Sequence, residues 1–182
     1  EYEITVRAEK ANYVPAEKTV TAVIKPAVLT VTADNKTYEY GTEQYDFTYR
    51  SEGYKGADTS KDVELAVVMS TTATKDSPED TYPISISGNK TTGNYTVTYV
   101  PGTLTIDKNS SLTVEAKGSG WTYDGMEHDL LSGPAAANVE GAKISYTLDG
   151  TTVSEVPKAL NAGTYVITVT AEKPNYATAT AK

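Results

Sequence analysis

The chain has 182 residues with a formal net charge of −8, and it contains no cysteine and a single histidine. The acidic balance argues against nucleic acid and anionic membrane surfaces as partners, because both are bound through basic faces. The lack of cysteine excludes a disulfide-stapled fold, and with one histidine it argues against a tetrahedral zinc site. No apolar run approaches transmembrane length, so no membrane insertion is expected in this segment.

One strand-like segment recurs along the chain, each time followed by an Asn-Tyr pair. Its copies begin at Tyr2, Tyr82 and Tyr165. The pentapeptides at residues 9–13 (Glu-Lys-Ala-Asn-Tyr) and 172–176 (Glu-Lys-Pro-Asn-Tyr) differ at a single position. Recurrence at about eighty residues indicates whole repeated modules, which are larger than solenoid units.

Residues 1–25 read as the C-terminal hairpin of a preceding repeat. Residues 2–8 and 18–24 alternate apolar and polar side chains on either side of the Asn12-Tyr13 turn, which predicts a β-hairpin. An isolated hairpin is marginally stable, so we expect it to pack against the next module or to pair with another chain. Lys25-Pro26 predicts a short linker after the hairpin, because proline interrupts the strand pattern.

Residues 28–107 read as one complete module. Pro101-Gly102 predicts the turn of its final hairpin. Between the second and third strands, Asp58 or Thr59 offers a helix cap ahead of Val63 and Leu65, so one short helical turn is expected within residues 56–65. The strands are expected at residues 28–33, 45–50, 66–73, 81–87, 94–100 and 103–106.

Residues 111–182 read as a second module, joined to the first by the polar linker Lys108-Asn109-Ser110. Asp149-Gly150 predicts a two-residue hairpin turn. By alignment with the first hairpin, we expect the last strand to continue past Lys182. The strands are expected at residues 111–117, 127–131, 143–148, 151–155, 163–171 and 177–181.

Two sets of motifs resemble repeats of large bacterial surface proteins. Residues 28–107 resemble the MBG repeat through the motifs at 38–41 (Tyr-Glu-Tyr-Gly), 81–84, 94–99 and 102–106. Residues 111–182 are similar to YDG-type, Ig-like repeats through Trp121-Thr122-Tyr123-Asp124-Gly125 and residues 161–165. The resemblance implies an extracellular, wall-attached or secreted array of modules with no active site to carry over.

The expected fold class is all-β, with tandem Ig-like β-sandwich modules. The alternative is a β-grasp-like middle module with one short helix. Tyr82 and Tyr165, each after a Thr at the start of a strand, occupy a position like the tyrosine corner of Ig-like sandwiches, where the hydroxyl bonds back to the main chain. In similar wall-attached modules a Lys-to-Asn isopeptide bond occurs. Strand lysines are scarce here and Lys143 is the best donor candidate, but no partner residue is evident.

Candidate functional residues are few, and no catalytic, cofactor-binding or metal-binding residue is predicted. The sequence has no Gly-x-Ser-x-Gly elbow that would supply a nucleophilic serine to pair with His128. It also has no Asp-x-Asp-x-Asp-Gly calcium loop. Trp121 and Tyr123 are possible ligand contacts, because aromatic rings near a turn can stack on a sugar or grip a partner. Tyr123 aligns with Tyr38 of the other module, which favours a core role and leaves Trp121 the better contact candidate.

We therefore expect a non-enzymatic stalk segment of a bacterial surface adhesin-like protein, which projects or spaces a distal binding domain. Its partners would be the neighbouring repeats of the same chain. One alternative is a module that binds a glycan, mucin or host protein. Another is an accessory domain of a secreted polysaccharide-degrading enzyme.

Overall fold

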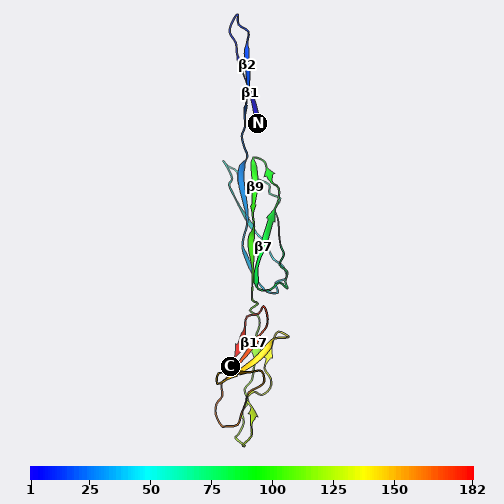
Figure 1. Cartoon of the computed structure of the whole chain (residues 1–182), viewed down its shortest axis with the longest axis vertical. Coiled ribbons are helices and arrows are strands. Elements are labelled where there is room, and N and C mark those ends of the chain that lie inside the picture. The colour runs from blue at the N-terminus through cyan, green and yellow to red at the C-terminus, as the bar shows by residue number, and fades with distance from the viewer. The chain divides into compact units, whose positions relative to one another are not determined.

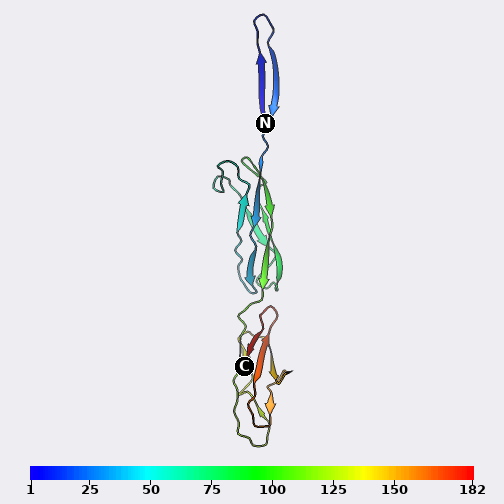
Figure 2. The same cartoon turned by 90° about the vertical axis from the view of Figure 1, so that its left-hand side faces the viewer.

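The computed structural model describes all residues from 1 to 182 and is all-β, with a β-sandwich-like architecture and no helix. Neither view of the ribbon shows a coiled segment (Figure 1, Figure 2). No helix is therefore present that has the length and apolarity to cross a membrane. The strands are β1 (Tyr2–Ala8), β2 (Ala16–Ala22), β3 (Ala27–Ala33), β4 (Lys36–Glu39), β5 (Tyr49–Glu52), β6 (Val68–Thr71), β7 (Asp80–Ser87), β8 (Thr91–Thr92), β9 (Tyr95–Val100), β10 (Gly102–Asp107), β11 (Val114–Glu115), β12 (His128–Asp129), β13 (Ala136–Ala137), β14 (Lys143–Leu148), β15 (Thr151–Val153), β16 (Lys158–Ala159), β17 (Ile167–Glu172) and β18 (Ala179–Ala181).

The chain forms two compact units. Unit 1 comprises Glu1–Asp34, Phe47–Ser70 and Ile84–Gly102. Unit 2 comprises Asn35–Asp46, Thr71–Pro83 and Thr103–Lys182.

Unit 1 contains a four-stranded sheet with the order β5-β3-β9-β8. In this sheet β3 pairs parallel with β9 and antiparallel with β5. Leu29 is buried on β3 while its neighbour Val28 is exposed, as the period-two alternation of a strand requires. Leu29 packs with Val63 and Tyr95 in a hydrophobic cluster, so the loop that carries Val63 contributes to the core.

The loop between β5 and β6 forms turns, and the short helix expected within residues 56–65 is absent. The Tyr95 hydroxyl donates to the Asp58 carboxylate at 2.6 Å and accepts from the Lys55 backbone N–H at 2.9 Å. The Asp62 carboxylate accepts from both the backbone N–H and the hydroxyl of Thr59. These side-chain bonds close local turns in place of a helix, so the helix prediction and the β-grasp alternative that depended on it are wrong.

The β1–β2 hairpin of unit 1 is a two-stranded antiparallel sheet. Its register runs from Tyr2 opposite Ala22 to Ala8 opposite Ala16, and every residue of both strands is exposed. Figure 2 shows the hairpin in blue with no third strand on either edge. The predicted hairpin is therefore confirmed.

The second sheet of the middle module has the order β4-β10-β7-β6, with β10 parallel to β4. Because β9 and β10 belong to different sheets, Pro101-Gly102 does not turn a hairpin, and that prediction is wrong. Pro101 has no N–H to donate, so it suits the point at which the chain leaves one sheet for the other. A Cβ on Gly102 would lie 2.9 Å from the Ala33 carbonyl oxygen, so only glycine allows this close approach.

The C-terminal module lies wholly in unit 2 and contains a sheet with the order β15-β14-β17-β18. Asp149 and Gly150 have φ angles of 48° and 79° and join β14 to β15, which confirms the predicted two-residue turn. The core residues come from several strands and from the loops between them. They are Leu112, Val114, Leu131, Ala135, Tyr146, Ile167, Val169 and Ala171.

Both predicted tyrosine corners bond back to the main chain. The Tyr82 hydroxyl donates to the Pro78 carbonyl oxygen at 3.0 Å, and the Tyr165 hydroxyl donates to the Asn161 carbonyl oxygen at 2.7 Å. Each bond spans four residues and fixes the segment that leads into a strand. The two tyrosines are therefore fold determinants of their modules.

Adjacent residues of β3 provide a matched test of this core. Leu29→Ala should lower the free energy of unfolding by about 2–5 kcal/mol, because Leu29 has no exposed surface and the truncation leaves a cavity. Val28→Ala should change it by less than about 0.5 kcal/mol, because 59% of Val28 is exposed. Urea unfolding followed by far-ultraviolet circular dichroism measures both, and equal losses would contradict the assigned burial.

Candidate functional site

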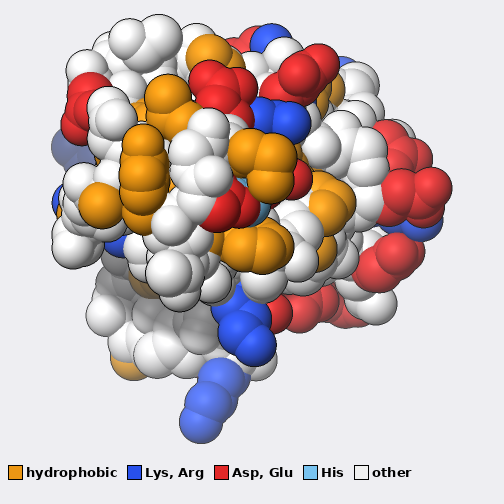
Figure 3. Space-filling view, turned by 90° about the horizontal axis from the view of Figure 1, so that it is seen from below, with side chains coloured by type: hydrophobic (Ala, Val, Ile, Leu, Met, Phe, Trp, Pro, Cys, Tyr) orange, Lys and Arg blue, Asp and Glu red, His pale blue; other side chains and the backbone are white.

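An open pocket of about 570 Å³ lies in the C-terminal module. Its walls come from residues 116–131 and 159–169, so strands β12 and β16 and the loops beside them frame it. Hydrophobic side chains gather on the face shown in Figure 3, with acidic side chains between them. The pocket brings together both residues that the sequence singled out, Trp121 and Tyr123.

Trp121 is a fixed and accessible ring. Its indole stacks on the His128 imidazole with ring centroids 4.4 Å apart and an interplanar angle of 17°. Its N–H lies 3.2 Å from the Ser119 hydroxyl oxygen and 3.1 Å from the Asp129 carbonyl oxygen. These contacts hold the edge and one face of the ring, while 63% of the residue remains exposed. The ring is thus positioned without being covered.

Asp124 holds His128 in place beneath Trp121. The His128 Nε2 atom lies 3.0 Å from each carboxylate oxygen of Asp124. The Asp124 carboxylate also accepts the Met126 backbone N–H at 2.9 Å, across a turn that contains Gly125 at a φ of 81°. The hydrogen bond from His128 and then that from Met126 lower the pKa of Asp124, because both stabilise its charged form.

Tyr123 is exposed, contrary to the core role that its alignment with Tyr38 favoured. Tyr38 lies on β4, where its hydroxyl donates to the Asp46 carbonyl oxygen and accepts from the Asp46 N–H. The segment around Tyr123 forms no strand, and 66% of the residue is exposed at the pocket. The two modules thus share a sequence motif but not its environment.

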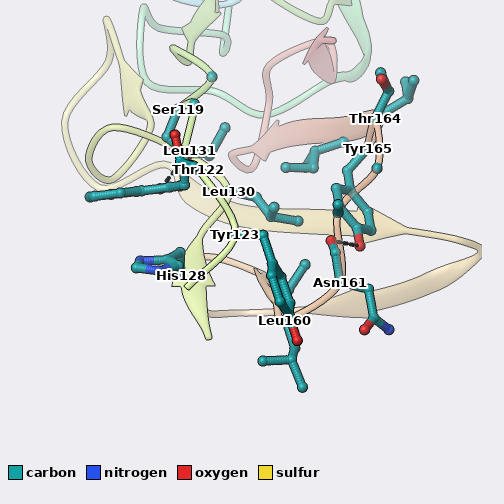
Figure 4. A pocket seen from close by; sticks show the side chains of 18 of the residues that line it. Ser119, Thr122, Tyr123, His128, Leu130, Leu131, Leu160, Asn161, Thr164 and Tyr165 are labelled. Atoms are coloured by element: carbon teal, nitrogen blue, oxygen red, sulfur yellow. Dashed lines mark hydrogen bonds between the residues drawn. The ribbon is translucent and has the colours of Figure 1, made fainter. Parts of the chain in front are cut away.

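The other wall of the pocket comes from the segment that leads into β17. In Figure 4 Asn161, Thr164 and Tyr165 lie along this segment, and the dashed line at Tyr165 is the bond from its hydroxyl to the Asn161 backbone. Leu160, which is 45% exposed, adds an apolar surface. The sequence marked residues 161–165 as a repeat motif and Tyr165 as a tyrosine corner, but it carried no signal that this segment lies opposite Trp121.

The pocket has aromatic, apolar and amide groups but no arrangement for covalent catalysis. The Ser119 hydroxyl donates to the Asp129 carbonyl oxygen and accepts from the Trp121 indole, and no hydrogen bond joins it to His128. No three His, Asp or Glu side chains of the chain lie together as a metal site would require. Lys143 is exposed on β14, so it lacks the apolar interior that an isopeptide donor needs.

A second feature is the segment between the two modules, where Asn109 is hydrogen-bonded on both sides. Its backbone N–H donates to the Asn175 carbonyl oxygen, and its own carbonyl oxygen accepts from the Ala177 N–H, both at 2.9 Å. Its side-chain amide donates to the Tyr40 carbonyl oxygen at 2.8 Å and accepts from the Ser111 N–H at 2.9 Å. The residue predicted as a linker is therefore bonded through every polar group.

Neighbouring side chains in unit 2 reinforce the contacts of Asn109. The rings of Tyr40 and Tyr176 meet edge to face with centroids 5.7 Å apart. The Ser110 hydroxyl donates to the Glu39 carboxylate at 2.8 Å. Tyr40 and Glu39 belong to the middle module, and Tyr176 belongs to the turn between β17 and β18. We call this set, with Asn109 and Asn175, the junction.

The Asp124–His128 pair predicts a pH response. Because the folded-state pKa of Asp124 lies below the ordinary value of 3.8, the pair contributes stability above that pH and loses it as pH falls through the lowered pKa. The carbon-13 shift of the Asp124 carboxyl should therefore titrate with a midpoint below 3.8. His128→Ala should move the midpoint upward, and an unchanged midpoint would show that His128 is not the main cause.

The comparisons with known proteins concern the middle module. No curated protein and no solved structure matches the chain. The family described as MBG domain (YGX type) matches residues 29–105, which include the core residues Leu29 and Leu104. The YDG-type resemblance of residues 111–182 lies outside that match and stays a prediction. Residues 29–105 thus match the MBG domain of the YGX type, as the motifs at 28–107 predicted.

Proposed function

We propose that the chain is a non-enzymatic structural segment of a bacterial cell-surface or secreted adhesin-like protein, in which joined modules project or space a distal binding domain. The junction at Asn109 carries this proposal. A flexible tether would leave the polar groups between two modules to water, whereas here every hydrogen-bonding group of Asn109 bonds to protein. A segment held in this way acts as a spacer of defined geometry.

The matched family supports a structural role in a surface protein, which is the general part of this proposal. MBG domains are found in surface proteins, and a structural repeat is compatible with that setting. The chain uses no cysteine, so packing and hydrogen bonds must supply the stability that disulfides give many small extracellular domains. The junction adds such bonds between modules of modest size.

Substitution of Asn109 tests the spacer. Asn109→Ala removes two side-chain hydrogen bonds, each about 1 kcal/mol, and should loosen the junction without unfolding either module. In nitrogen-15 relaxation, residues 35–46 and 111–182 should share one rotational correlation time in the unmodified chain and have different ones in the variant.

Lys108→Ala is the matched control for this experiment. Lys108 makes only an exposed ion pair with Glu79 at 3.6 Å, which contributes little in water. The Lys108→Ala substitution should therefore leave the shared rotational correlation time unchanged. Independent tumbling of the two regions in the unmodified chain would contradict the spacer proposal.

The pocket supports a second candidate function, binding of a glycan, including the glycans of mucins. This candidate rests on the exposed indole of Trp121, which stacks on His128 with one face and leaves the other face free. The apolar face of a sugar ring can stack on such a ring, while the Asn161 amide on the opposite wall offers donors and an acceptor for hydroxyl groups. The acidic surface favours neutral over anionic sugars.

Trp121→Ala tests the second function on a glycan and mucin array. If the pocket binds sugar, the variant should lose at least about tenfold in affinity, the scale of one lost aromatic contact. Tyr13→Ala is the matched control, because Tyr13 is an equally exposed aromatic residue, at 68%, outside the pocket. A blank array with the folded unmodified chain, or equal losses in both variants, would exclude a Trp121-dependent glycan site.

A further inference from the structure

The β1–β2 hairpin repeats the β17–β18 hairpin in structure as well as in sequence. When Tyr2 is aligned with Tyr165, the cross-strand partners of the two hairpins coincide. The same register arises although one hairpin is free and the other lies in a complete sheet. The corresponding pairs are Val6–Lys18 with Val169–Ala181, Arg7–Glu17 with Thr170–Thr180, and Ala8–Ala16 with Ala171–Ala179.

The turns of the two hairpins also match. Asn12 and Asn175 have φ angles of 64° and 65°, a left-handed conformation that asparagine tolerates. The Tyr13 N–H donates to the Lys10 carbonyl oxygen at 3.0 Å, as the Tyr176 N–H does to that of the matching lysine at 3.1 Å. In both turns the lysine ammonium lies over the tyrosine ring. The two copies of the pentapeptide therefore form the same turn.

The C-terminal copy shows what such a hairpin packs against. Along its outer edge β17 pairs antiparallel with β14, from Lys143 opposite Glu172 to Leu148 opposite Ile167. Its inward side chains Ile167, Val169 and Ala171 are buried in the module core. An edge strand and an apolar core thus complete this hairpin.

The N-terminal copy presents the same edge and the same face uncovered. Ile4 and Val6 occupy the positions of Ile167 and Val169, yet they are 50% and 58% exposed. The side of β1 that corresponds to the β14-paired side of β17 has no partner strand. Val6, Ala8 and Val20 line a shallow apolar hollow on the hairpin. An exposed edge with an apolar face is a template for another strand.

We propose that the β1 edge and the face formed by Ile4, Val6 and Ala8 are a docking surface for the body of a repeat module like residues 111–164. The partner supplies a strand in the role of β14, which pairs antiparallel with β1, and an apolar core that covers Ile4 and Val6. Docking completes the sheet in the order β14-type strand, β1, β2. This is strand addition, in which backbone bonds give affinity and the inward side chains give register.

The residues that differ between the two hairpins fit this role. Lys18 stands where the C-terminal copy has Ala181, on the same face as Val6. It lies on β2, which would be the outer strand of the completed sheet, so its methylene chain can cover the core while the ammonium stays in water. Arg7 opposite Glu17 replaces two threonines on the other face, and their 3.2 Å ion pair is solvent-exposed.

A chimera of the full chain tests the proposal. Residues 111–164 are placed directly before Tyr2, so that β1–β2 takes the sequence position of β17–β18 after the same module body. We expect hydrogen exchange of the β1 amides to slow to the rates of the β17 amides in the same molecule. In the unmodified chain the β1 amides should exchange rapidly.

A reference chimera controls for the graft itself. It carries residues 111–182 followed directly by residue 20, so the grafted module keeps its own hairpin and the downstream chain is the same. If the reference is protected while the β1 amides of the test chimera exchange as fast as in the unmodified chain, the hairpin does not complete a module and the proposal is overturned.

A single substitution provides the second readout. Val6→Asp should abolish the protection gained in the chimera, because the equivalent Val169 is only 1% exposed in the core. In the unmodified chain the same change should leave the unfolding midpoint where it was, because Val6 is exposed there. Protection that survives Val6→Asp would show that the Ile4–Val6 face is not the docking surface.

Discussion

Alternate burial along the strands is the constraint on which the rest of this structure depends. In β3, Leu29, Val31 and Ala33 are buried while the residues between them are not, and β10 repeats the pattern with Leu104 and Ile106. Neither helices nor disulfides stabilise the modules, so each sheet must bury one face to outweigh the entropy of ordering its chain. The β1–β2 hairpin has the same alternation and no core to receive it.

Strand positions could be predicted because alternation is a local signal. The predicted strands at residues 28–33, 81–87, 94–100 and 143–148 fall on β3, β7, β9 and β14. Apart from the β1–β2 and β14–β15 hairpins, strand partners could not be predicted, because alternation states which side chains turn inward and not which strand lies alongside. The parallel pairs β3–β9 and β4–β10 therefore went unforeseen, and the strands of two to four residues, such as β8 and β13, are too short to show a period.

The candidate site was predicted only in part, because the sequence marks single residues and not the neighbours that surround them. Trp121 stood out because it is the only tryptophan of the chain and has no aromatic counterpart in the other module. Tyr123 was assigned to the core because its motif matches that of Tyr38, but a motif fixes a side chain only where a neighbouring strand covers it. Residues 108–110 were read as a linker because they are polar, but the hydrogen bonds of Asn109 join it to Tyr40, Ser111, Asn175 and Ala177, and all of these partners except Ser111 lie far along the chain.

The bonded state of Asn109 also bears on how the molecule withstands proteases. A protease must draw several residues of its substrate into an extended, unpaired form, and exposed segments between modules are the usual place where this happens. Here the connection is already engaged as a backbone bridge to Tyr176, with Ser110 tied to Glu39. Cleavage after Lys108 would first require these bonds to open, so the segment that looks most vulnerable in the sequence is protected by the fold.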